Sequence, residues 1–238
     1  MSGVITPAPI ALIGCGAIGR LHALRFKADS RAKIVALCDP HPANAERLRA
    51  ELSLDAQIFA DPHAALGCPG LRAAVIASPT LLHYEQVCLA FELGLDVLCE
   101  KPLAARREEI VDLIERRDRL GRMLSVSYQR RYKAPYLTAR RELAERADWY
   151  GPLNEVHIFV CERWQQTIHG TWRDDPQIGA GYFGDAGSHQ IDVVNFISGR
   201  KPEAVLAQSD KCGSRVEIVT RVLGRLSGGV GLVAHFVG

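Results

Sequence analysis

Short apolar runs alternate with stretches of helical spacing up to about residue 128, and this rhythm constrains the fold most. The expected strands lie at 9–14, 33–39, 73–78, 96–100 and 123–128, and the expected helices at 17–28, 42–52, 81–93 and 105–119. Such alternation predicts βαβ units and a parallel sheet. Because the runs are apolar almost throughout, the sheet should be covered on both faces. The predicted fold class is therefore α/β, with a doubly wound parallel sheet.

After residue 128 the rhythm changes. A helix is expected at 132–146, a strand at 154–162, a polar loop at 163–181, a short helix near 186–198, and strands at 204–209, 216–223 and 230–237. Strands gathered in sequence favour an antiparallel or mixed sheet. We therefore expect two domains, 1–128 and 129–238, the second of α+β type with an open, largely antiparallel sheet.

The chain stops at Gly238, directly after an apolar run. An apolar final strand with nothing after it would lie exposed at the edge of its sheet. The second domain is therefore expected to be incomplete or to be completed by another chain.

Composition argues against several classes of protein. The net charge is only +2, and the densest basic run, 116–122, is expected to be a solvated helix face rather than a nucleic-acid patch, since aromatic residues do not interleave it. The sequence lacks both the long apolar stretch of a membrane span and the charged start of a signal peptide. The seven cysteines form no C-x-x-C pair. A cytoplasmic protein is expected, with neither nucleic acid nor membrane as partner.

The segment GCGAIG, residues 14–19, fits the pattern G-x-G-x-x-G between an expected strand and an expected helix. In that context the pattern marks a Rossmann dinucleotide-binding domain, although a chance glycine turn is the alternative. Gly14 would permit the tight turn, Gly16 would leave room for a pyrophosphate, and Gly19 would let helix and strand pack closely. The helix N-terminus would attract the anion. The expected cofactor contacts in this loop are Gly14, Gly16, Ala17, Ile18 and Gly19.

Asp39 ends the next strand, about 20 residues after Gly19, where a ribose-binding acid belongs. A carboxylate there would accept hydrogen bonds from the ribose hydroxyls and repel a 2′-phosphate. NAD is therefore favoured as the cofactor. His41 and Arg47 lie nearby and keep NADP as an alternative.

Residues at the end of the strand predicted over 73–78 are expected to line the nicotinamide side, because ligands bind beyond the carboxyl ends of parallel strands. They are Ser78, Pro79 and Thr80. His83, on the first turn of the next helix, is a further candidate for contact with the cofactor. Its alternative interpretation is a helix-face histidine with a local hydrogen bond.

Glu100, Lys101 and Pro102 follow the strand predicted over 96–100, at the same edge of the sheet as the glycine loop. An ammonium there could hydrogen-bond a substrate hydroxyl beside the nicotinamide and assist its deprotonation. Glu100 would orient the site or contact the nicotinamide ribose. The alternative is a solvated pair of charges in a loop.

The motifs GCGAIG, LCDP, ASPTLLH and CEKPLA, in this order, resemble the Gfo/Idh/MocA family of oxidoreductases. Segment 172–199 adds what resembles the family's glycine-rich stretch and its D-x-G-x-H-x-x-D pattern, at Asp185, Gly187, His189 and Asp192. The resemblance runs from about residue 10 to the end. It implies an NAD(P)-dependent dehydrogenase that interconverts a secondary alcohol and a ketone on a sugar, cyclitol or related polyol. It further implies that Lys101 is the catalytic lysine, His189 the active-site histidine and Asp185 the assisting acid.

Asp185 and His189 are four residues apart, so on a helical turn they would share a face and the carboxylate could steady the imidazole. Neutral His189 could then take a proton from the substrate hydroxyl while Lys101 stabilises the developing alkoxide. A metal site, which we do not expect, and an ordinary helix start capped by Asp185 are the alternatives. Asp192, one turn beyond His189, is expected to be structural or to support the residues that contact the substrate.

The resemblance leaves several points open. Gln129 could contact the carboxamide ribose, and Arg173 could anchor a substrate oxygen or be a loop cation. Polar side chains of loop 162–181 could bind the polyol. The family's second domain usually carries more strands than this chain has. Family members commonly associate through the face of this sheet, so the resemblance implies that a homo-oligomer is possible but doubtful for a chain with a shortened sheet. An inactive NAD(H)-binding sensor or fragment, and an NAD-dependent glycosidase, are the alternative functions.

Overall fold

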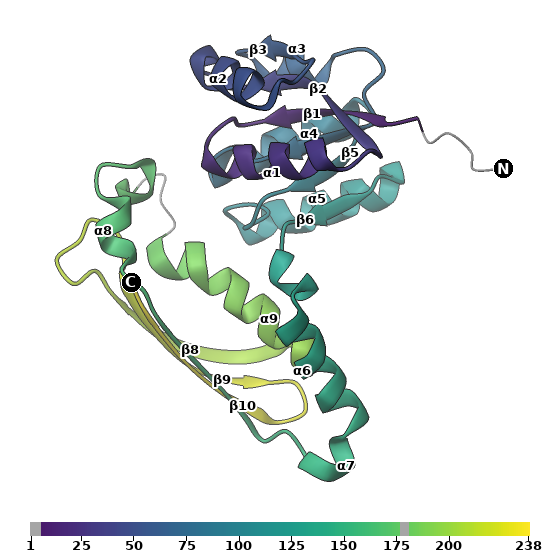
Figure 1. Cartoon of the computed structure of the whole chain (residues 1–238). Helices are drawn as coiled ribbons and strands as arrows, with labels where there is room; N and C mark the ends of the chain where they lie inside the picture. The colour runs from purple at the N-terminus through teal and green to yellow at the C-terminus, as the bar shows by residue number, and fades with distance from the viewer. Residues whose placement is uncertain (1–5, 177–180) are drawn as a thin grey trace. The chain divides into compact units, whose positions relative to one another are not determined.

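A computed structural model of the chain describes residues 6–176 and 181–238 (Figure 1). The chain divides into two compact units, Met1–Ser127 and Tyr128–Gly238. Among the described residues, no helix has the length and apolar character that a membrane crossing requires.

The first unit is a six-stranded parallel sheet with strand order β3-β2-β1-β4-β5-β6. Its strands are β1 Ala8–Ile13, β2 Ala32–Cys38, β3 Gln57–Phe59, β4 Ala73–Ile76, β5 Asp96–Cys99 and β6 Leu124–Val126. Its helices are α1 Ala17–Ala28, α2 Pro42–Leu52, α3 Pro62–Leu66, α4 His83–Glu92 and α5 Arg107–Leu120, with a 3₁₀ turn at Thr80–Leu82. This is the strand order of dinucleotide-binding sheets, so the predicted Rossmann fold is confirmed.

Helices cover both faces of this sheet, because successive strand residues point to opposite sides. Ile10 and Leu12 of β1 pack in one buried cluster with residues of α1 and α2. Ala11 and Ile13 pack in the other with residues of α3, α4 and α5. Burial on both sides explains why the strands are apolar almost throughout.

The second unit contains a four-stranded mixed sheet with strand order β7-β10-β9-β8. Its strands are β7 Glu155–Cys161, β8 Pro202–Asp210, β9 Val219–Leu226 and β10 Val230–Val237. Its helices are α6 Ala134–Glu145, α7 Ala147–Tyr150, α8 Trp164–Ile168 and α9 Ser188–Ser198, with 3₁₀ turns at Gln129–Tyr132 and Trp172–Asp174 and a π turn at Phe183–Gly187. β7 runs parallel to β10, whereas the β10–β9 and β9–β8 pairs are antiparallel. The predicted largely antiparallel sheet is confirmed.

One face of this sheet is buried and the other is exposed. Val156, Ile158 and Val160 of β7 face the core, as the alternation predicts. On the other face Phe159 is 72% exposed and Leu223 is 60% exposed.

Several expectations about the second unit are wrong. β10 is not an exposed edge, because it pairs with β7 on one side and β9 on the other. Among the described strands of the second sheet, β7 and β8 are the edges. β9 begins at Val219, three residues later than expected. The expected polar loop contains α8, whose Trp164 and Ile168 are buried in the core; residues 177–180 of that loop lie outside the described part of the chain.

Candidate active site

The predicted cofactor motifs gather at one edge of the first sheet, because the last residues of β1, β2, β4 and β5 lie level with one another. These are Ile13, Cys38, Ile76 and Cys99. The residue after each is the first of a loop, and these loops carry the glycine pattern, Asp39, Ser78–Thr80 and Glu100–Lys101. Strand order reverses between β1 and β4, which is where dinucleotides bind in such sheets.

Two glycines of the loop are required by close backbone contacts. Gly14 has φ +92°, and a Cβ there would lie 2.6 Å from the carbonyl oxygen of Ala77. A Cβ on Gly19 would lie 1.9 Å from the carbonyl oxygen of Gly14. The loop therefore turns sharply against the residues that follow β4, while α1 packs tightly on the loop.

The start of α1 is open to a ligand. Gly16 precedes the helix, and a Cβ at this position would meet nothing within 4 Å among the described residues. Ala17 and Ile18, the first two helical residues, are exposed. Free space beside a helix N-terminus fits a pyrophosphate, which the partial positive charge there would attract.

Asp39 is nearly buried, at 6% exposed, and it joins the glycine loop to the start of α2. Its Oδ2 accepts a hydrogen bond from Cys15 N, and its Oδ1 accepts from His41 N and Asn44 Nδ2, all at 3.0 Å. The sequence analysis missed Asn44, although an amide side chain in the first turn of the helix that follows the acid could have indicated this hydrogen bond. Burial, with the nearby Asp39 carboxylate, raises the pKa of the Cys15 thiol to about 12, so this thiol is neutral at physiological pH.

Contacts with side chains of α4 stabilise the loop after β4. Ser78, Pro79 and Thr80 are half-buried, and Ser78 Oγ donates to Gln86 Oε1 at 2.6 Å. His83 is only 1% exposed. Its Nε2 lies 2.8 Å from Ser78 O and its Nδ1 lies 2.9 Å from Pro102 O. This burial favours a structural role for His83 over direct contact with a cofactor.

Glu100 and Lys101 begin the turn after β5, and both are half-buried. Glu100 Oε1 lies 2.8 Å from His22 Nε2, and Glu100 Oε2 accepts a hydrogen bond from Lys101 N at 3.2 Å. Burial acts to raise the pKa of Glu100, but the hydrogen bonds from His22 and Ser127 outweigh it, so the pKa lies below its usual value. Glu100 is therefore an ionised carboxylate enclosed by protein donors, and not a solvated loop charge.

The predicted catalytic acid of the second unit lies in the π turn that leads into α9. Asp185 Oδ2 accepts a hydrogen bond from Trp164 Nε1 at 3.1 Å and lies 3.4 Å from Arg173 Nε. Gly187 is required in this turn, since a Cβ there would come within 2.5 Å of the Phe183 ring. Such π turns are frequent at functional sites. The sequence analysis left Arg173 as either an anchor for a substrate oxygen or a loop cation. In the structure it is ion-paired with Asp185.

His189 lies on the first turn of α9 and is 8% exposed. Its ring stands edge-on to Tyr128 at a centroid distance of 6.0 Å. Burial, with the nearby Asp192 carboxylate, raises the pKa of Tyr128. Asp192 is itself ion-paired with Arg131, whose Nε donates to Asp192 Oδ2 at 2.9 Å. Asp192 therefore holds the 3₁₀ turn at Gln129–Tyr132 against α9.

Three further findings concern the predicted contacts and a metal site. Gln129, predicted to contact the cofactor, is exposed. Glu217 was not predicted: its Oε1 accepts a hydrogen bond from Phe183 N at 2.9 Å, and burial raises its pKa. Within the described residues, no group of three or more histidine, cysteine, aspartate or glutamate side chains could hold a metal ion.

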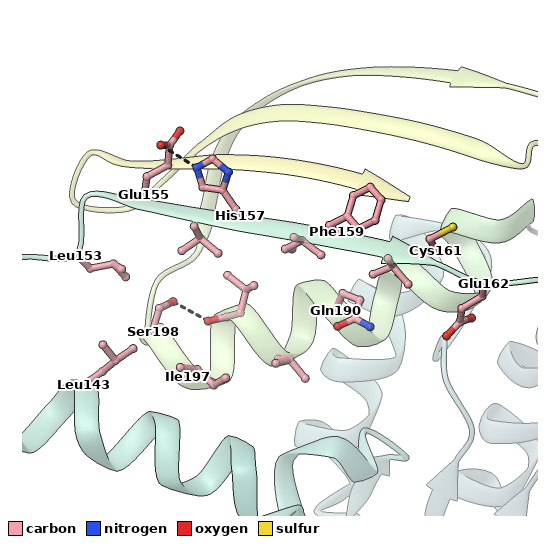
Figure 2. A pocket seen from close by; sticks show the side chains of 15 residues that line it. Leu143, Leu153, Glu155, His157, Phe159, Cys161, Glu162, Gln190, Ile197 and Ser198 are labelled. Carbon is pink, nitrogen blue, oxygen red and sulfur yellow. Dashed lines mark hydrogen bonds and ion pairs between the residues drawn. The ribbon is translucent and has the colours of Figure 1, made fainter. Parts of the chain in front are cut away.

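A groove of about 640 Å³ runs along the edge of β7, separate from these residues (Figure 2). Figure 2 shows Gln190, Ile197 and Ser198 of α9 below the strand, with Leu143 of α6 beyond them. Among the described residues, its lining includes neither Asp185 nor His189. The chemistry proposed below does not use the groove.

Two family models match the chain. The model described as "Oxidoreductase family, NAD-binding Rossmann fold" matches residues 9–128, and the GFO/IDH/MocA C-terminal domain matches residues 136–237. Together they cover nearly all of the sequence.

Known proteins with similar sequences include sugar and cyclitol dehydrogenases. Inositol 2-dehydrogenase of Streptomyces avermitilis is 32% identical over 199 residues, which are 82% of this chain and 54% of that protein. D-glucoside 3-dehydrogenase of Escherichia coli is 26% identical over 205 residues, which are 84% of this chain and 57% of that protein. The chain thus spans about half the length of the curated relatives it matches.

Solved structures share the fold at lower identity. Scyllo-inositol dehydrogenase from Lactobacillus casei, with bound NAD(H) and scyllo-inositol, has a TM-score of 0.85 at 20% identity, covering 97% of this chain and 69% of that one. GenD2 from gentamicin A biosynthesis, in complex with NAD, has a TM-score of 0.88 at 21% identity, covering 99% of this chain and 67% of that one.

Proposed function

Because this chain belongs to the GFO/IDH/MocA oxidoreductase family, we propose that it is an NAD-dependent dehydrogenase that interconverts a secondary alcohol and a ketone on a sugar, cyclitol or related polyol. The observation that carries the proposal is the gathering of the glycine loop, Asp39 and Lys101 at one edge of the first sheet. The names of the relatives, inositol 2-dehydrogenase and D-glucoside 3-dehydrogenase, support the polyol class.

In the proposed arrangement the first unit holds the cofactor. The open space at Gly16 takes the pyrophosphate, and Asp39 accepts hydrogen bonds from a ribose. NAD, when bound, supplies the acceptor for the hydrogen and electron pair that leave the alcohol carbon. Five residues are assigned to the nicotinamide side of the site: Ser78, Pro79, Thr80, Glu100 and Gln129.

The second unit would supply the group that exchanges the proton, and the first unit the group that stabilises the charge. His189 takes the proton of the substrate hydroxyl, and the Lys101 ammonium stabilises the negative charge that develops on that oxygen. Asp185 steadies the imidazole and its charge. In the reverse direction His189 returns the proton to the alkoxide oxygen.

The test uses the full chain, NAD, and a panel of cyclitols and glycosides, with the absorbance of the reduced nicotinamide as readout. We expect cofactor reduction with at least one member of the panel. His189→Ala should abolish it while NAD affinity, measured by calorimetry, stays within a few-fold. His157→Ala, a histidine of the same unit whose side chain is 68% exposed, is the matched control and should leave the rate unchanged. NAD binding without reduction by any polyol would contradict the proposal.

A further inference from the structure

Two histidines to which the proposed chemistry assigns no step contact the turn that carries Lys101. His22 belongs to α1 and His83 to α4. One contacts Glu100 and the other Pro102, the residues on either side of the lysine. The turn is therefore held on both flanks by side chains from different helices.

His22 connects the cofactor helix to the turn. The side chains of His22 and Glu100 are 15% and 14% exposed, so their 2.8 Å contact is largely shielded from water. The other Glu100 oxygen accepts the hydrogen bond from Lys101 N. A continuous path of hydrogen bonds thus runs from α1, through one carboxylate, to the backbone of the lysine.

His83 connects the turn to the loop after β4. Its two ring nitrogens face the carbonyl oxygens of Pro102 and Ser78 at 2.9 and 2.8 Å. Carbonyl oxygens only accept, and a neutral imidazole has a single N–H, so the neutral ring donates to one of the two. Substitutions that retain one nitrogen position or the other can therefore separate the two contacts.

We propose that His22 and His83 are positioning residues that hold the turn on both sides of Lys101 and so fix where its amine is presented. The inference rests on the proposed role of Lys101. A catalytic group must be held by supporting contacts because displacement by about 1 Å can cost about 100-fold in rate. Held at Glu100 and Pro102, the lysine backbone has little freedom to move.

The kinetic test compares variants that keep or remove each contact. His22→Ala should lower kcat about tenfold or more, with the KM for NAD within about twofold, and His22→Gln should recover most of the rate because its amide nitrogen replaces Nε2. His83→Asn, which replaces Nδ1 and keeps the contact with Pro102, should retain more activity than His83→Gln, which keeps the contact with Ser78. His63→Ala, an exposed histidine of the same unit, is the control.

Hydrogen exchange tests the inference without turnover. In His22→Ala the amide of Lys101 should exchange several-fold faster than in the wild type, while amides in the core of β5 should not change. A wild-type chain that turns over no polyol would refute the proposed function but leave this readout intact. Unchanged exchange at Lys101, or a kcat in His22→Ala and both His83 variants within twofold of wild type, would overturn the inference.

Discussion

Asp39 acts at the residue scale as a junction between loops as well as a binding group. Its two oxygens accept hydrogen bonds from the glycine loop and from the start of α2. A carboxylate has about four acceptor positions, so three protein donors leave capacity for a ribose hydroxyl. The same hydrogen bonds fix the orientation in which that capacity is offered.

Replacing Asp39 by alanine should therefore weaken NAD binding and narrow the preference for NAD over NADP. We expect about a tenfold loss of NAD affinity, because a charge-assisted hydrogen bond and its organising contacts are lost together. NADP should lose less, since the repulsion of its 2′-phosphate disappears. Calorimetric titration with both cofactors measures the two affinities.

Asp55→Ala is the matched control, because Asp55 is an exposed acid of the same unit whose side chain is 91% exposed. It should leave both affinities unchanged. An unaltered ratio of NAD to NADP affinity in Asp39→Ala would refute the specificity role of Asp39.

At the scale of elements, periodicity predicted most of the first sheet because its strands are buried on both faces. The same signal missed β3 and α3, which have only three and five residues and carry too few apolar positions to show a period. The π turn before α9 could not be predicted, since it depends on Gly187 accommodating the Phe183 ring at close range. The place of β10 in its sheet also depends on long-range pairing, which the sequence of a single strand does not specify.

In the candidate site, too, local motifs predicted some residues, whereas contacts between distant parts of the sequence were not predicted. Gly14, Gly19 and Asp39 follow from a motif whose geometry is local, and the structure places them as the motif requires. The contact of His22 with Glu100 joins residues 78 positions apart, and no spacing rule predicts it. Roles for Asp185 and His189 were implied by family resemblance and stay predictions.

Glu217, which accepts the Phe183 amide hydrogen beside the π turn, should make the stability of the second unit fall as pH rises. Burial raises the pKa of Glu217. A carboxyl group with a raised pKa in the folded state contributes its stability below the unfolded pKa of about 4.3 and loses it as pH rises through the folded pKa. In Glu217→Gln the amide oxygen can still accept from Phe183 N, but this pH dependence is gone.

Urea unfolding of both proteins from about pH 4 to pH 7 measures the difference, because that range spans the unfolded pKa. The wild type should lose stability relative to Glu217→Gln as pH increases. The matched variant Glu203→Gln changes an exposed position in β8. Its free energy of unfolding should differ from that of the wild type by the same amount at every pH. A constant or opposite trend for Glu217→Gln would contradict the argument from burial.

At the scale of the whole molecule, the proposed chemistry draws on both units. Lys101 belongs to the first unit and His189 to the second. A substitution at either residue should therefore stop turnover, although all the residues assigned to the cofactor except Gln129 lie in the first unit. The chain spans about half the length of its curated relatives. Turnover must therefore be measured on this chain by itself.

The most direct measurement is the rate of NAD reduction by the full chain with a polyol substrate, compared between wild type and Lys101→Ala. We predict that Lys101→Ala loses at least about 100-fold in kcat, since it removes the group that stabilises the developing alkoxide, while the Kd for NAD stays within a few-fold. Wild-type turnover that persists in Lys101→Ala would contradict the account.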